Sequence, residues 1–186
     1  MALTPMMQHY LETKEKYSDC ILFYRLGDFY EMFFEDAKEV SRELELTLTG
    51  KDCGLPERAP MCGIPYHAAN GYIEKLVARG YKVAICEQME DPALAKGLVE
   101  RQVIRVVTPG TVTDPSMLDE RSNSFLLSVC FAGEKAGLAL VDVSTGEFFV
   151  HEITDATNRL ADEIARIQPT EIIANDLVAL RNCHVP

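Results

Sequence analysis

Short apolar runs alternate with segments of helical periodicity along the first 108 residues, and this alternation restricts the fold more than any other sequence feature. Thr4-Pro5 is typical of a helix start, with Thr as the N-cap and Pro at the first helical position. Residues 20–26 form an apolar run that predicts a buried strand. We also expect strands at 46–49, 81–87 and 102–108, helices at 29–45 and 68–78, a short helix starting at Asp91-Pro92, and a loop at 50–65. This order predicts a mixed-sheet α/β domain.

The composition changes at residues 109–124, where Pro, Gly, Ser, Thr and charged residues are frequent. We therefore predict a first domain at 1–110, a linker at 111–123 and a second domain at 124–186. In the second domain we expect strands at 124–131, 137–143, 147–153 and 171–174 and a helix at 156–167. Three antiparallel strands, a helix and a strand are the opening of a ribonuclease-H-like unit, so we expect this domain to be a truncated one.

The bulk composition indicates a soluble globular protein able to bury a core, with 47% hydrophobic and 25% charged residues. No apolar run approaches the length of about 18 residues that a membrane-spanning helix needs, and the N-terminal residues lack the features of a signal peptide. The six cysteines include no C-x-x-C pair, which favours reduced thiols over a disulfide framework or a zinc site. We expect a cytoplasmic protein that has no contact with membranes.

The net charge of −11 argues against generic nucleic-acid binding, which usually requires a basic surface. Both parts of the chain are acidic, with net charges of −5 for residues 1–115 and −6 for residues 116–186. Any affinity for DNA must come from a small local patch, from contacts that depend on DNA shape, or from other parts of a larger protein.

The sequence Gly27-Asp28-Phe29-Tyr30-Glu31 allows two interpretations. In the structural one, Asp28 and Glu31 form a capping box at the start of the helix at 29–45, and Phe29 packs beneath the preceding strand. In the functional one, Phe29 and Glu31 project toward a ligand. A Phe side chain inserted between stacked bases kinks duplex DNA from the minor groove, and a carboxylate accepts a hydrogen bond from a displaced base. The pattern alone favours the structural interpretation.

Five blocks of the first domain resemble the N-terminal part of the bacterial MutS family of DNA mismatch repair proteins. A weaker resemblance to the connector domain of that family lies at Asp142-Val143-Ser144-Thr145-Gly146-Glu147-Phe148. The five blocks are Thr4-Pro5-Met6-Met7-Gln8 with Tyr10-Leu11, residues 23–33 (FYRLGDFYEMF), residues 60–67 (PMCGIPYH), residues 83–88 (VAICEQ) and residues 105–111 (RVVTPGT).

The resemblance implies roles for the residues of the second block. By it, Phe29 stacks on a mispaired base from the minor groove and Glu31 forms a hydrogen bond to that base. Tyr30 is expected to pack inside the protein. The function implied is therefore recognition of mispaired or looped duplex DNA in mismatch repair.

The segment from Gly50 to His67 resembles the family segment that lies along the DNA beside the Phe. Lys51 and Arg58 are candidates for phosphate contacts, although a single basic side chain in a loop is more often only solvated. The remaining candidates for DNA contacts are Met61, Tyr66 and His67.

No cofactor is expected in this chain, and the binding of ATP and Mg belongs to other parts of the full-length family protein. The sequence has no G-x-x-x-x-G-K-[ST] motif, so no ATPase is expected here.

The resemblance implies docking of the partner MutL on the connector domain and a homodimer for the full-length protein, whereas we expect this chain to be monomeric. Two alternatives are a MutL-docking module, with DNA contact secondary, and a small α/β enzyme that uses Cys62 with His67, or Asp142.

Overall fold

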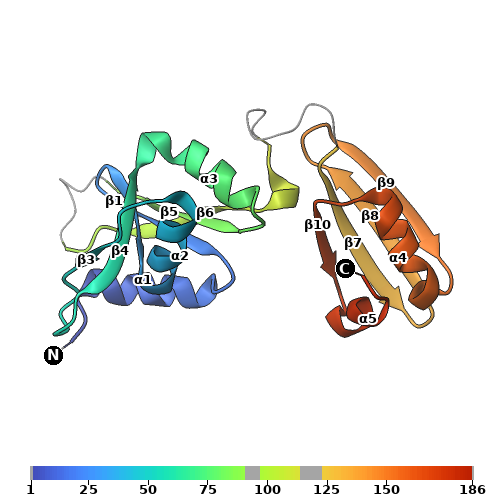
Figure 1. Ribbon diagram of the computed structural model, residues 1–186, viewed down its shortest axis with the longest axis horizontal. Helices are drawn as coiled ribbons and strands as arrows, with labels where there is room; N and C mark the ends of the chain where they lie inside the picture. The colour runs from blue at the N-terminus through green and yellow to red at the C-terminus, as the bar shows by residue number, and fades with distance from the viewer. Residues whose placement is uncertain (1, 91–96, 114–122, 186) are drawn as a thin grey trace. The chain divides into compact units, whose positions relative to one another are not determined.

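The computed structural model describes residues 2–90, 97–113 and 123–185, and the chain divides into two units, Met1–Thr108 and Pro109–Pro186. Figure 1 shows the elements of each unit. The short helix predicted at Asp91-Pro92 and most of the predicted linker lie outside the described residues.

The first unit is built on a six-stranded sheet with the order β3-β4-β2-β1-β5-β6. The pairing of β1 with β5 is parallel and the other pairings are antiparallel, which confirms the predicted mixed-sheet α/β class. The strands are β1 (Ile21–Leu26), β2 (Phe29–Phe33), β3 (Thr49–Lys51), β4 (Ala59–Pro65), β5 (Val83–Gln88) and β6 (Arg101–Val107). The helices are α1 (Pro5–Lys16), α2 (Phe34–Leu44) and α3 (Ala69–Val77), with a 3-10 turn, η1 (Tyr66–Ala68), before α3.

Helix α1 begins as its sequence predicts. The Thr4 side chain accepts a hydrogen bond from the backbone N–H of Met7 at 3.4 Å, and Pro5 occupies the first turn. Figure 1 shows α1 and α3 on opposite sides of the sheet. On the α1 side, the helix contributes Met7 and Tyr10 to a buried cluster that also contains Leu22, Tyr24, Phe33, Ala84 and Cys86. The two strands β1 and β2 are thereby fixed at the centre of the unit.

The predicted helix start at residue 29 is wrong. Residues 29–33 form strand β2, which pairs with β1 through a two-residue turn at Gly27-Asp28, and the helix begins only at Phe34. Gly27 has φ +58°, and hairpin turns of two residues need a positive φ at their first position. Asp28 and Glu31 therefore form no capping box.

The predicted loop at residues 50–65 is also wrong for most of its length. Gly50 and Lys51 belong to β3, and residues 59–65 form β4, which pairs with β2 on one side and β3 on the other. The predicted strand at 46–49 is shifted, since β3 covers Thr49–Lys51. The segment expected to be a DNA-side loop is therefore mainly a hairpin at the edge of the sheet.

The second unit has a four-stranded sheet with the order β10-β7-β8-β9. Strands β7, β8 and β9 form an antiparallel meander, and β10 lies parallel to β7, so the predicted element order of three strands, a helix and a strand is confirmed. The elements are β7 (Phe125–Ala132), β8 (Lys135–Asp142), β9 (Glu147–Ile153), α4 (Ala156–Ile167), β10 (Glu171–Ala174), α5 (Leu177–Asn182) and the 3-10 turn η2 (Pro109–Thr111). Among the described residues, no helix is both long and apolar enough to span a membrane.

Candidate functional site

Phe29 is the first residue of β2 and is 47% exposed. Its backbone lies between Leu26 of β1 and Pro65 of β4, so the residue is anchored on both sides by the sheet. A large aromatic side chain that is half exposed on a central strand contributes little to the core. The strand nevertheless holds its backbone in one place, so the exposed apolar side chain of Phe29 projects from a fixed position on the sheet.

Glu31 projects from the same face of the sheet as Phe29, because side chains two residues apart on a strand share a face. Tyr30 points to the opposite face, is 6% exposed and packs against Phe23 with ring centroids 5.8 Å apart. The prediction that Tyr30 packs inside the protein is confirmed. The strand, not a helix start, thus sets the separation between the Phe and the carboxylate.

The Glu31 carboxylate is paired with Lys51 of β3. The distance between Lys51 Nζ and Glu31 Oε2 is 2.5 Å, and the side chains are 33% and 16% exposed, respectively. Lys51 reaches across β4, and its Nζ lies 5.8 Å from the centroid of the Phe33 ring. The acidic group is therefore charge-compensated within the protein.

Gly63 of β4 is the strand partner of Glu31. A Cβ atom at this position would lie 3.5 Å from Cγ of Glu31 and 3.8 Å from Cδ1 of Phe29. The absent side chain thus leaves open the space beside both Phe29 and Glu31. A larger side chain here would compete with them for that space.

The turn before Phe29 is held by Arg25, a residue that the sequence analysis did not single out. Its Nε donates a hydrogen bond to the carbonyl of Gly27 at 2.5 Å, and its guanidinium lies 3.7 Å from the centroid of the Tyr66 ring. It also pairs with Glu87 at 3.5 Å. Arg25 therefore links the hairpin turn to η1 and β5.

Glu87 also accepts a hydrogen bond from the Tyr30 hydroxyl. Burial raises the pKa of Tyr30, and the neighbouring carboxylate raises it further, so the phenol stays protonated and remains a donor. The backbone N–H of Tyr66 donates to the carbonyl of Asp28 at 3.0 Å. The first bond anchors the Tyr30 side chain and the second anchors the backbone at Asp28, so both neighbours of Phe29 are held.

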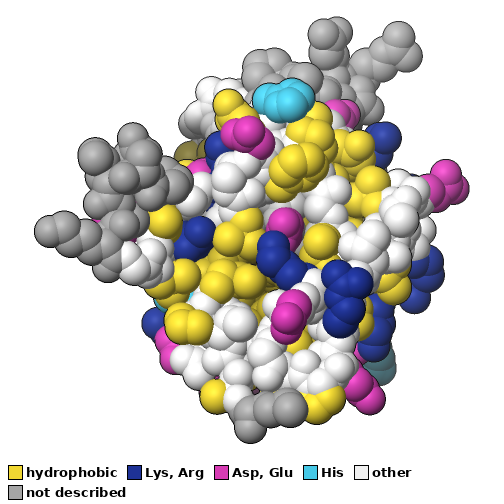
Figure 2. Space-filling model, turned by 90° about the vertical axis from the view of Figure 1, so that its left-hand side faces the viewer, with side chains coloured by type: hydrophobic (Ala, Val, Ile, Leu, Met, Phe, Trp, Pro, Cys, Tyr) yellow, Lys and Arg dark blue, Asp and Glu magenta, His cyan; other side chains and the backbone are white. Residues whose placement is uncertain are grey.

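The other predicted site residues are less closely grouped. Arg58 is exposed, precedes β4, and forms no ion pair with any described residue. Met61 pairs with Phe33 and packs against the buried cluster, so it is partly a core residue. His67 is exposed in η1, with its ring 5.7 Å from that of Tyr66. Figure 2 shows apolar side chains with Lys and Arg among them on the side of the first unit where β3 and β4 lie.

The structure places Cys62 and Asp142, one residue from each of the two enzymatic alternatives, in buried positions. Cys62 is 1% exposed, and burial raises the pKa of its thiol, which keeps it in the unreactive form. Asp142 is 1% exposed and accepts hydrogen bonds from Ser124, Ser144 and Thr145, which lower its pKa and hold a turn. Within residues 2–90, 97–113 and 123–185, no three acidic, His or Cys side chains cluster as metal ligands would.

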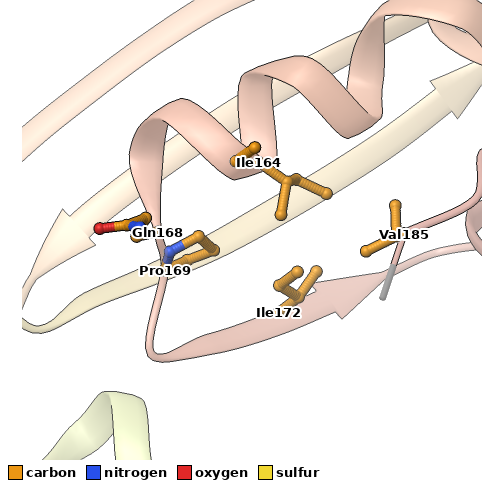
Figure 3. Close-up of a pocket in the computed structure, with 6 residues that line it drawn as sticks. Ile164, Gln168, Pro169, Ile172 and Val185 are labelled. Atoms are coloured by element: carbon orange, nitrogen blue, oxygen red, sulfur yellow. The ribbon is translucent and has the colours of Figure 1, made fainter.

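An apolar pocket lies between the end of α4 and β10 in the second unit (Figure 3). No residue with a titratable side chain lines it, so it offers no acid, base or nucleophile. Its lining residues are Ile164, Ala165, Gln168, Pro169, Ile172 and Val185.

Sequence comparison defines the family. Residues 4–116 match the model of MutS domain I, and residues 124–182 match that of MutS domain II. The chain therefore belongs to the MutS family.

Relatives agree with this placement. The DNA mismatch repair protein MutS of Acetivibrio thermocellus is 65% identical over 176 residues, which cover 94% of this chain and 20% of that protein. The protein of the same name from Clostridioides difficile is 62% identical over 94% of this chain and 18% of its own length, and that from Caldanaerobacter subterraneus is 56% identical over 100% and 22%. The chain spans about a fifth of the length of these relatives.

Proposed function

We propose that this chain is the mismatch-recognition part of a longer DNA mismatch repair protein, followed by the start of a connector domain. The observation that carries the proposal is the half-exposed Phe29, held on a central strand with Glu31 on the same face. Membership of the MutS family supports it, because the similar proteins carry the name DNA mismatch repair protein.

In the proposed complex with DNA, the Phe29 ring inserts from the minor groove beside a mispaired base. Unstacking a base step costs roughly a few kcal/mol, and the cost is lower where a mispair or a looped base already weakens the stack. The ring therefore selects for deformability of the duplex and not for its sequence. The fixed backbone of Phe29 favours insertion, because a more mobile side chain would lose more conformational entropy when it inserts.

Glu31 accepts a hydrogen bond from the displaced base in this proposal. Arg58 contacts phosphate, since it is exposed and has no acidic partner among the described residues. Tyr66 and His67 lie beside the Phe29 turn and complete the DNA-facing side, with Met61 supporting it from β4. The net charge of −11 implies that most of the affinity comes from elsewhere in the longer protein.

The remaining assignments concern the longer protein. We propose that its ATPase, with ATP and Mg, lies outside this chain, that it works in the cytoplasm as a homodimer, and that the second unit contributes to docking of MutL. This chain then supplies recognition and no catalysis. DNA distortion at Phe29 would reach the ATPase through the second unit.

Base stacking next to the mispair gives a direct test. The full-length protein is titrated into a duplex that has 2-aminopurine beside a mispair and into the matched duplex. We expect a rise in fluorescence for the mispaired duplex only, because insertion of Phe29 unstacks the probe, and no rise with Phe29→Ala. An equal rise for both duplexes, or an undiminished rise with Phe29→Ala, would show that Phe29 does not read stacking.

A further inference from the structure

The ion pair between Lys51 and Glu31 gives Lys51 a function other than phosphate contact. We infer that Lys51 is a positioning residue, which orients the Glu31 carboxylate and compensates its charge so that the carboxylate can face DNA. The inference rests on the proposed function, in which Glu31 accepts a hydrogen bond from the mispaired base.

The geometry leaves one carboxylate oxygen for the base. Lys51 Nζ lies 2.5 Å from Oε2 of Glu31, and Oε1 has no hydrogen-bond partner within the described part of the chain. With Oε2 fixed by a charged donor, the carboxylate loses rotational freedom before DNA arrives. Oε1 is then a preoriented acceptor, which lowers the entropic cost of the bond to a base.

Charge compensation follows from the same contact. A bare carboxylate near the minor groove would be repelled by the phosphates on both sides. Glu31 is 16% exposed and Lys51 33%, so bulk salt screens the pair less than it would screen two fully exposed side chains. The DNA therefore meets a neutral pair at Glu31, and Lys51 itself is not available as a free cation.

The path of the Lys51 side chain is also defined. Lys51 is on β3 opposite Ala59, whereas Glu31 is on β2 opposite Gly63, so the Lys side chain runs diagonally over β4. It passes the Phe33 ring, with Nζ 5.8 Å from the ring centroid. This route depends on the strand register, which explains why the sequence pattern predicted only a solvated or phosphate-bound lysine.

Arg58 provides a matched control on the same hairpin. It is exposed and lacks an acidic partner among the described residues, whereas Lys51 has one. The test measures the affinity of the full-length protein for mismatched and matched duplexes as a function of salt concentration. The variants are Lys51→Met, Lys51→Arg, Arg58→Met, Glu31→Gln and the double variant Lys51→Met/Glu31→Gln.

For Lys51→Met we expect the ratio of mismatched to matched affinity to fall by about tenfold, a coupling of the size seen between contacting charged groups. Lys51→Arg should restore the ratio. In the Glu31→Gln background, Lys51→Met should cause no further fall, because no carboxylate remains to be positioned. Arg58→Met should weaken both duplexes equally and reduce the salt slope by about one.

Three results would overturn the inference. Lys51→Met could behave like Arg58→Met, with an equal loss for both duplexes and a reduced salt slope, which identifies a phosphate contact. It could lower the affinity ratio equally in both backgrounds, which shows that it does not act through Glu31. An unchanged ratio in Glu31→Gln alone would contradict the proposed role of Glu31, and with it the role of Lys51. Thermal unfolding of each variant checks that the fold is retained.

Discussion

The guanidinium of Arg25 lies 3.7 Å from the centroid of the Tyr66 ring, and the same side chain donates a hydrogen bond to the carbonyl of Gly27. Arg25 is on β1 and Tyr66 follows β4, so the contact joins two strands that flank β2. The turn that precedes Phe29 is therefore held by a side chain whose own position is fixed by stacking. We expect the direction of the Phe29 ring to depend on this arrangement.

Replacement of Arg25 tests that dependence. We expect Arg25→Leu to lower stability by about 2 kcal/mol, since it removes the cation–π contact with Tyr66, the hydrogen bond to Gly27 and the ion pair with Glu87. Amide hydrogen exchange at Tyr66, whose N–H donates to the carbonyl of Asp28, should become faster, and the preference for mismatched DNA should fall. Tyr66→Phe keeps an aromatic ring for the stack and should leave the stability and the exchange rate unchanged. Slow exchange in Arg25→Leu would show that the turn is held by other contacts.

Gly63 tests the space beside the two site side chains. A Cβ atom there would make only ordinary contacts with Glu31 and Phe29, so Gly63→Ala should keep the affinity ratio. Gly63→Leu should lower it, because the added atoms would occupy the space beside both side chains. Competition binding with mismatched and matched duplexes measures the effect. A full affinity ratio in Gly63→Leu would mean that the position of these side chains is not critical.

The Asp142 carboxylate should make the stability of the second unit sensitive to acid. Its hydrogen bonds lower the pKa of the carboxyl below the ordinary value of about 3.9. The folded state therefore holds the proton less tightly than the unfolded state. The stabilisation is present above the unfolded pKa of about 3.9 and is lost as the pH falls through the folded pKa. Hydrogen exchange of the β7 and β8 amides should accelerate as the pH falls below about 4, beyond the normal pH effect on exchange.

The variant Asp142→Asn should destabilise the second unit by about 2 kcal/mol at pH 7, because a charged acceptor is lost. The stability of the second unit should then change less as the pH falls. Asp162→Asn changes an exposed carboxyl and serves as the control. The same smaller change in Asp162→Asn would show that the acid response does not come from Asp142.

Much of the fold could be predicted because its signals are local. The helix cap at Thr4-Pro5 and the apolar runs that became β1, β5 and β6 each act within a few residues. In the second unit the order of strands and helix also follows from local patterns. These elements require no knowledge of which strands become neighbours.

The hairpin of β1 and β2 was missed because Gly27-Asp28 has two local interpretations. Gly-Asp between two runs rich in aromatic residues is a hairpin signal, yet Asp with Glu three residues later is a capping signal. Pairing of β2 with β4 decides between them, and β4 contains Pro60, Gly63 and Pro65, which usually argue against a strand. That pairing is a property of the tertiary structure.

The candidate site likewise has features that could be predicted from the sequence and features that could not. The exposure of Phe29 and the packing of Tyr30 were implied by the family resemblance. The pattern alone favoured a Phe29 packed beneath the preceding strand. The contacts of Lys51 with Glu31 and of Arg25 with Tyr66 depend on strand register, which no short pattern contains. The DNA contacts themselves remain predictions.

The isolated 186-residue chain should bind DNA weakly or not at all. Its net charge of −11 leaves little electrostatic attraction to phosphate, and Arg58 alone cannot supply it. Fluorescence anisotropy with a mismatched duplex at physiological salt measures this. Nanomolar, mismatch-selective binding by this chain would show that recognition needs no other region of the protein.

The most direct test of the account compares Phe29→Ala with the unaltered full-length protein in competition between mismatched and matched duplexes. We predict that the preference for the mismatched duplex disappears while the thermal unfolding temperature changes little, because the side chain is 47% exposed. Phe148→Ala, which removes a 63% exposed Phe from β9, is the control and should keep the preference. Retained discrimination in Phe29→Ala would contradict the central claim that Phe29 reads the stacking of the mispaired site.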